Sequence, residues 1–151
     1  MADNYTSFSC VIDIPPEHRA LVTRLLQGDE TTFEKIQWSD DESEDPGFAW
    51  EWSSLQGRGP EQLWINSDES GNVEDVCIFV SYIQRRLDLE EPFEITWANT
   101  CSKLRVGEFG GGACIIYKGK QRWVNTGSWC DRTKKQMIEA EARRIAREAN
   151  K

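Results

Sequence analysis

The sequence contains one histidine, and this scarcity excludes several kinds of catalytic site. His18 is the sole imidazole among 151 residues. Histidine-rich zinc sites, paired-histidine phosphodiesterases and serine triads that need a second histidine are therefore excluded. The five cysteines include no C-x-x-C pair, and their number is odd. We expect reduced, mostly buried thiols rather than disulfides or a zinc site, and no bound metal or cofactor.

Long apolar runs are also lacking. No run approaches the roughly 18 residues that a membrane-spanning helix needs. Residues 1–4 are polar and slightly acidic, unlike a signal peptide. We therefore expect a cytoplasmic protein that has no membrane partner. The chain has 38% hydrophobic and 29% charged residues, which suits one globular domain spanning residues 1–151.

Positive charge is scarce in the first two thirds of the chain. Residues 1–99 contain 21 acidic and 6 basic residues, whereas residues 100–151 contain 5 and 12, and the net charge is −8. An acidic protein is poorly suited to non-specific nucleic-acid binding, because lysine and arginine drive phosphate contact. The basic C-terminal third can still bind a phosphate group locally.

Acidic residues are densest at positions 40–45, where five of six residues are acidic. Mutual repulsion and a lack of apolar surface predict a mobile acidic loop over residues 29–47. One interpretation is a solvated loop with no partner. The other is a mimic of nucleic-acid phosphate that occupies a basic groove on another protein.

Hydrophobic periodicity predicts an α+β fold. Alternating apolar residues predict strands, and apolar residues at helical spacing predict helices that begin near Pro16, near Asn72 and near Asp131. The resulting order is β-α-β-β-α-β-β-β-α. It favours a mainly antiparallel sheet of about six strands with helices packed on one face. The predicted strands cover residues 8–14, 48–52, 63–66, 93–98, 113–117 and 121–124, with turns at 56–60 and 118–120.

The predicted C-terminal helix, residues 131–151, has a narrow apolar stripe made of Ile138, Ala142, Ile145 and Ala149. The rest of this helix is charged. We expect a surface helix that lies across one edge of the domain.

Residues 100–112 combine a thiol, two cations, a carboxylate and four glycines between two predicted strands. As a binding loop, its glycine amides can cradle an anion while the cations add charge-assisted hydrogen bonds. The alternative is a β-bulge before Ala113, with Glu108 bound to Arg105. The segment matches neither the P-loop nor the dinucleotide-binding pattern. The candidate binding residues are Cys101, Lys103, Arg105, Glu108, Gly110, Gly111 and Gly112.

Cys101 is the one thiol in a cationic setting, which is typical of reactive cysteines. A nucleophilic role needs a base, and the sequence does not bring His18 near it. We therefore assign no catalytic residue. Among the seven tryptophans, Trp64 and Trp129 fit the strand alternation least well. They are candidate interface residues, with ordinary core packing as the alternative.

Three segments resemble a known family. Residues 100–113 read TCSKLRVGEFGGGA, residues 96–98 read TWA, and residues 63–73 read LWINSDESGNV. Over about residues 60–125 the chain resembles uncharacterised small proteins encoded by bacteriophages, prophages and plasmids of proteobacteria. The resemblance implies a mobile-element setting and brings no activity with it.

These observations lead to one main hypothesis and two alternatives. The main hypothesis is a non-enzymatic cytoplasmic accessory protein of a mobile genetic element. It binds a host or phage partner through residues 100–112 and charged surfaces, for example as an inhibitor of host machinery. The first alternative is a protein that binds a small anionic ligand or nucleotide signal. The second is a thiol enzyme that uses Cys101.

Overall fold

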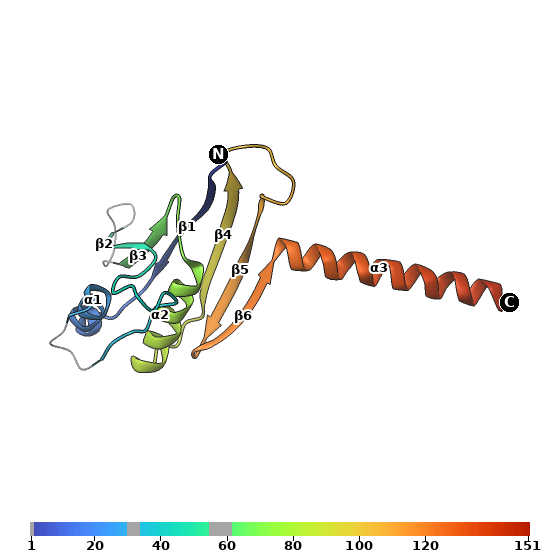
Figure 1. Ribbon diagram of the computed structural model, residues 1–151. Coiled ribbons are helices and arrows are strands. Elements are labelled where there is room, and N and C mark those ends of the chain that lie inside the picture. The colour runs from blue at the N-terminus through green and yellow to red at the C-terminus, as the bar shows by residue number, and fades with distance from the viewer. Residues whose placement is uncertain (1, 30–33, 55–61) are drawn as a thin grey trace.

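The structure is a computed structural model that describes residues 2–29, 34–54 and 62–151. Within these residues, six strands form one antiparallel sheet in the order β2-β3-β1-β4-β5-β6 (Figure 1). The sequence-based prediction of a single α+β domain with the chain order β-α-β-β-α-β-β-β-α is confirmed. The strands are β1 (Asn4–Ile12), β2 (Ala49–Ser53), β3 (Gln62–Ser67), β4 (Phe93–Cys101), β5 (Gly110–Tyr117) and β6 (Lys120–Asn125).

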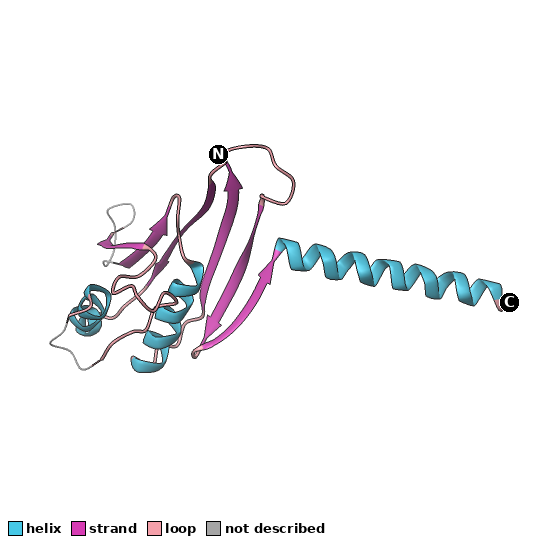
Figure 2. Ribbon diagram, in the orientation of Figure 1, coloured by secondary structure: helices cyan, strands magenta, loops and turns pink. Residues whose placement is uncertain are grey.

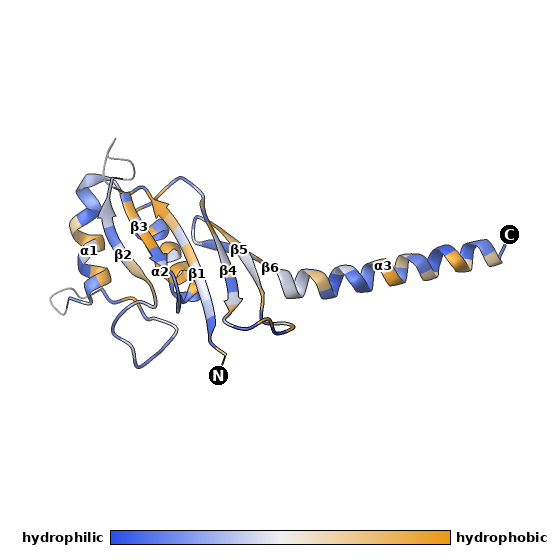
Figure 3. Cartoon of the chain, turned by 90° about the horizontal axis from the view of Figure 1, so that it is seen from above, coloured by the Kyte–Doolittle hydropathy of each residue, from blue (hydrophilic) through white to orange (hydrophobic). Residues whose placement is uncertain are grey.

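Two helices cover one face of the sheet, and a third helix leaves it (Figure 2). The helices are α1 (Arg19–Gln27), which follows a short 3₁₀ turn η1 (Pro16–His18), α2 (Val73–Arg86) and α3 (Thr126–Ala149). Alternate strand residues face α1 and α2 and form one continuous core with them. Figure 3 shows apolar residues concentrated where β1 and β3 lie beside α2. The helix residues at the centre of this core are Val22, Leu25, Leu26, Val76, Phe79, Val80 and Ile83.

Local sequence signals set the ends of several elements. Gly28 ends α1 in the left-handed conformation, with φ 63°. The side chain of Asn72 caps α2 by accepting a hydrogen bond from the Asp75 amide, 3.2 Å away. Lys118 and Gly119 form the two-residue turn between β5 and β6, and both have positive φ. The turn predicted at residues 56–60 lies outside the described residues.

The acidic segment before β2 is fastened to the start of α2. Its Trp38 is buried, and the indole Nε1 donates to the Glu44 carbonyl at 3.3 Å. The carboxylate of Asp75, itself 2% exposed, accepts hydrogen bonds from the amide and hydroxyl of Ser39 and from the Gly47 amide, at 2.7–2.8 Å. These bonds fix both ends of the acidic run.

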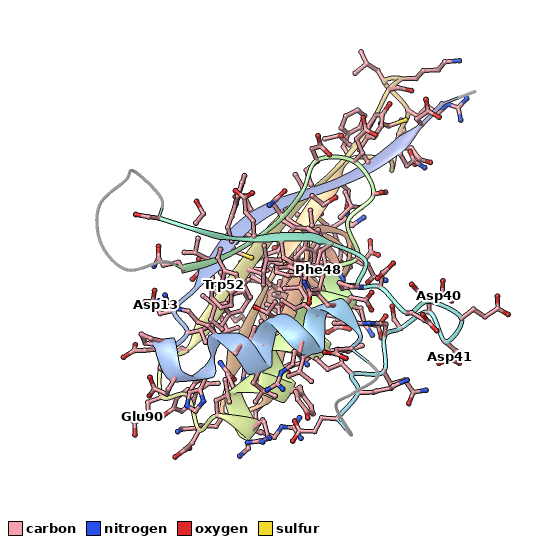
Figure 4. The ribbon with its side chains drawn as sticks, turned by 90° about the vertical axis from the view of Figure 1, so that its left-hand side faces the viewer. Asp13, Asp40, Asp41, Phe48, Trp52 and Glu90 are labelled. Carbon is pink, nitrogen blue, oxygen red and sulfur yellow. The ribbon has the colours of Figure 1, made fainter. Side chains whose placement is uncertain are left out.

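The acids of the run nevertheless point outward. Figure 4 shows Asp40 and Asp41 at the margin of the molecule, whereas Phe48 and Trp52 lie among the crowded side chains between β2 and the helices. All five acidic residues between positions 40 and 45 are exposed. The segment therefore presents a negatively charged surface on an anchored backbone.

Helix α3 does not lie across the domain, so that prediction is wrong. It begins at Thr126, five residues earlier than predicted, and the Asn125 side chain caps it by accepting from the Ser128 amide at 2.8 Å. No residue of α3 is buried. Figure 1 shows the helix projecting from the end of β6. The stripe that begins at Ile138 is about 18 Å along the helix from its start, too far out to reach the sheet.

Candidate functional site

The three consecutive glycines belong to strand β5, and the loop is shorter than the sequence indicated. The register between β4 and β5 runs without interruption from Phe93 opposite Ile116 to Asn99 opposite Gly110. This continuous pairing corrects both sequence-based interpretations, since residues 110–112 form neither a loop nor a β-bulge. The connection between the strands is confined to residues 102–109, which we call the β4–β5 loop.

Close packing explains why β5 begins with glycine. A Cβ atom on Gly112 would overlap the indole of Trp97, and one on Gly110 would lie 2.5 Å from the hydroxyl oxygen of Thr126. The Gly111 amide donates to that same hydroxyl at 3.2 Å. The glycines thus let Trp97 and the start of α3 approach the strand. Because the Gly111 amide is already bonded to Thr126, it does not contribute to an anion cradle.

The tip of the β4–β5 loop carries two apolar side chains that touch nothing. Leu104 is 97% exposed and Val106 is 103% exposed. Gly107, with φ 83°, makes the turn that follows them. Sequence reasoning selected the charged residues of this loop and passed over these two. The signal that could have identified them as candidate binding residues is their apolar character within a polar, glycine-rich segment.

The charged candidates surround this tip without converging on one point. Lys103 and Arg105 are exposed and Glu108 is half-buried. Among the described residues, no ion pair joins Arg105 to Glu108. Glu108 lines an open hollow of about 510 Å³ together with Gly110, Gly111 and the start of α3, but Lys103 and Arg105 do not. The structure therefore brings Glu108 and the glycines together and leaves the two cations outside.

Cys101 ends β4, where it pairs with Asn4 at the start of β1. His18 follows the opposite end of β1. A nine-residue strand spans about 26 Å, so the thiol and the imidazole lie at opposite ends of the sheet. This separation gives Cys101 no histidine base.

Three other thiols lie in or beside the core. Burial raises the pKa of Cys10 to about 12, and burial is also the main cause that raises the pKa values of Cys77 and Cys114. Neutral thiols of this kind pack as small apolar groups and are poor nucleophiles at neutral pH. All five cysteines are free. Cys77 and Cys114 are buried, Cys10 and Cys101 are half-buried and Cys130 is exposed, so fewer thiols are buried than the sequence predicted.

The two tryptophans proposed as interface residues differ in exposure. Trp64 lies on the sheet face that α1 and α2 leave uncovered, half-buried, and its Nε1 donates to the hydroxyl of Ser9 at 2.8 Å. Trp129 is exposed in the first part of α3. Sequence reasoning missed Trp123 in β6, which is exposed although its ring meets that of Trp97 edge to face at 5.6 Å. An edge strand leaves such a residue half uncovered, and the alternating pattern does not show which strand is at the edge.

In the part of the chain that the structure describes, exposed large hydrophobic residues are confined to the C-terminal third. Every large hydrophobic side chain that is exposed among the described residues lies after position 103. They come from the β4–β5 loop, from β5 and β6, and from α3. We call this set the C-terminal apolar surface: Leu104, Val106, Phe109, Ile115, Tyr117, Trp123, Val124, Trp129, Met137, Ile138 and Ile145.

Within residues 2–29, 34–54 and 62–151, no group of three or more His, Cys, Asp or Glu side chains is arranged to hold a metal ion. In the same residues, no helix is both long enough and apolar enough to cross a bilayer. Comparisons with protein-family models, curated proteins and solved structures found no match to this chain.

Proposed function

We propose that this chain is a non-enzymatic binding protein whose C-terminal apolar surface docks onto a partner protein. The confinement of every exposed large hydrophobic residue of the described chain to positions 104–145 carries the proposal. Exposed large hydrophobic residues on a protein with a well-formed core are candidates for interaction sites, and the β4–β5 loop, β5, β6 and α3 each present such residues. Tryptophan and arginine are also frequent anchors at interfaces, and this surface includes Trp123 and Trp129.

The tip of the β4–β5 loop is the centre of the proposed contact. Leu104 and Val106 contribute nothing to the core, so their apolar character serves binding rather than folding. Lys103 and Arg105 alternate with them and are exposed. Cations around an apolar tip suit an acidic partner surface, because complementary charge speeds association and fixes orientation.

The setting of the partner follows from the resemblance to phage, prophage and plasmid proteins. We propose that the chain is a cytoplasmic accessory protein of a mobile element and that it binds a host or phage protein, including as an inhibitor of host machinery. The exposed acids at positions 40–45 provide a second, negatively charged surface on the same molecule. Mimicry of nucleic acid by that surface is part of the same hypothesis.

The alternatives have weaker support. Binding of a small anion or nucleotide would need Lys103 and Arg105 to act with the glycine amides, but these cations lie outside the hollow beside the glycines. A thermal-shift panel of nucleotides and phosphates tests anion binding. A ligand present at one hundred times its Kd raises the free energy of unfolding by about 2.7 kcal/mol. A thiol enzyme would need Cys101 to react with iodoacetamide much faster than an ordinary exposed thiol.

Affinity capture with a matched variant tests docking. The wild-type chain and a Leu104→Ser/Val106→Ser variant are immobilised and exposed to lysate of cells that carry the gene, and bound proteins are quantified by mass spectrometry. A Glu17→Ser variant serves as the control, because Glu17 is exposed on η1, outside the C-terminal apolar surface. We expect one protein to be retained by wild type and control and reduced at least about tenfold with the loop variant. Equal recovery on all three would contradict the proposal.

A further inference from the structure

The far half of α3 presents an apolar stripe that the described part of its own domain does not cover. Ile138, Ala142, Ile145 and Ala149 recur at intervals of four, three and four residues, which places them within an arc of about 60° on the helix. Ile138 is 70% exposed and Ile145 is 55% exposed. Figure 1 shows this part of α3 standing clear of the sheet. None of the described residues covers the stripe, which leaves it open to another molecule.

We propose that two copies of this chain associate by packing their α3 helices antiparallel along this stripe. Alanine at positions 142 and 149 lets two helix backbones approach closely, and the isoleucines fill the space on either side. An antiparallel pair centred near Ala142 places Ile138 of one copy beside Ile145 of its partner. A single stripe is therefore self-complementary, as a two-fold symmetric interface requires.

Charges on both sides of the stripe fit this same alignment. On one side of the stripe, Glu139 lies level with the partner's Arg143. The two-fold symmetry repeats this contact between Arg143 and the partner's Glu139. On the other side, Lys134 lies level with the partner's Glu148. Helices that pack antiparallel bring like sides together, so both sets of opposite charges meet in one register. Flanking charges of this kind select the partner and its orientation.

One like-charge contact arises near the two-fold axis, and the helix already compensates for it. Glu141 of each copy approaches Glu141 of the other in this register. Arg144 donates to Glu141 at 2.6 Å and to Glu148 at 2.7 Å within the same helix. The arginine neutralises much of this negative charge, and hydrogen bonds from it lower the pKa of Glu141. The contact is therefore compatible with pairing.

The charge of the globular part favours the antiparallel over the parallel arrangement. Residues 1–125 contain 22 acidic and 11 basic residues, whereas residues 126–151 contain 4 and 7. A parallel pair would place two strongly acidic bodies side by side. An antiparallel pair places them at opposite ends of helices about 36 Å long, well beyond the screening length of about 8 Å at physiological salt.

Sedimentation equilibrium of the purified full chain measures self-association with no docking partner present, and the docking test varies only Leu104 and Val106, so failure of one proposal is distinguishable from failure of the other. We expect the average mass to rise from 17.4 kDa toward twice that value as concentration increases from about 1 µM to about 500 µM, the range suited to a modest interface. An Ile138→Gln/Ile145→Gln variant stays monomeric. Ala140→Gln is the control, because Ala140 is exposed on the same helix but lies about 160° from Ile138, and it associates as wild type does.

Charge exchange tests the orientation while the isoleucines stay in place. Glu139→Lys weakens association at least about threefold, and Glu139→Lys with Arg143→Glu restores it, because the opposite charges meet again across the interface. A chain that remains monomeric at about 500 µM overturns the proposal, as does an Ile138→Gln/Ile145→Gln variant that associates like wild type. Association without rescue by the double charge exchange overturns the antiparallel register.

Discussion

Gly112 in β5 lies directly against the indole of Trp97 in β4, and a single added Cβ atom would overlap the ring. This contact seats a large aromatic side chain at the base of the C-terminal apolar surface. It also explains a glycine that would otherwise weaken a strand. The same strand brings Thr126, the first residue of α3, into hydrogen-bonding distance of Gly111.

Gly112→Ala is expected to destabilise the protein by about 1–3 kcal/mol, because the indole must shift within a packed environment. Urea denaturation followed by tryptophan fluorescence measures the change. Gly127→Ala is the matched control, since the nearest atom to a Cβ there is 3.6 Å away. That control should be neutral or slightly stabilising, because alanine favours the first turn of α3. Equal stability of Gly112→Ala and wild type would contradict the packing described for Trp97.

Asp75 is expected to hold the acidic segment onto α2. Asp75→Ala removes the acceptor for the Ser39 amide, the Ser39 hydroxyl and the Gly47 amide, and should cost at least about 2 kcal/mol of unfolding free energy. Asn72→Ala removes the helix cap and the hydrogen bond that the Asn72 side chain donates to the Ser39 hydroxyl at 2.7 Å, but leaves the Asp75 acceptor in place, and should cost about 1–2 kcal/mol. Urea unfolding gives both values. Hydrogen exchange at the Ser39 and Gly47 amides should rise sharply only in Asp75→Ala, and unchanged protection would show that other contacts fasten the segment.

Alkaline pH is expected to destabilise the fold through the half-buried thiol of Cys10. Burial raises the pKa of Cys10 from 9.0 to about 12, so the native thiol keeps its proton where the unfolded one loses it. The stabilising contribution is therefore complete below pH 9 and is lost as the pH rises toward 12. Urea midpoints measured between pH 7 and pH 10.5 should fall less steeply for Cys10→Ala than for wild type. The control is Cys130→Ala, at an exposed position, which should show the wild-type slope of urea midpoint against pH. The same slope in wild type, Cys10→Ala and Cys130→Ala would contradict the role assigned to Cys10.

The apolar tip of the β4–β5 loop is expected to be dispensable for folding. Leu104→Ser/Val106→Ser should change the unfolding free energy by no more than about 0.5 kcal/mol, because both side chains are fully exposed. Thermal and urea unfolding measure this directly. A loss of several kcal/mol would mean that the tip packs against the domain and would remove it as a docking element.

The sequence predicted the scaffold well where local chemistry decides the structure. Hydrophobic periodicity predicted the helix that Asn72 caps. Residue type predicted the glycine that ends α1 and the two-residue turn at Lys118. Each of these features depends on residues close together in the chain, so pattern and propensity agree with the tertiary result.

The candidate site was less predictable, because it depends on partners far apart in sequence. Three glycines predict a flexible loop, but their role as strand residues depends on Trp97 and Thr126, which no local pattern connects to them. The amphipathic stripe at Ile138 and Ile145 predicts a packed helix, yet both side chains stay exposed in the described part of the domain. Trp38 is buried in the core, although the composition of its segment indicates a mobile loop.

Site-specific photocrosslinking from the loop tip tests the docking proposal most directly. A photoreactive amino acid is placed at position 104, or at position 17 as an exposed control, and the chain is irradiated in cells that carry the gene. We predict one discrete adduct from position 104 and none from position 17. Excess unlabelled wild type should suppress it, whereas excess Leu104→Ser/Val106→Ser should not. No adduct at position 104, or the same adduct from both positions, would contradict a partner-binding role for this surface.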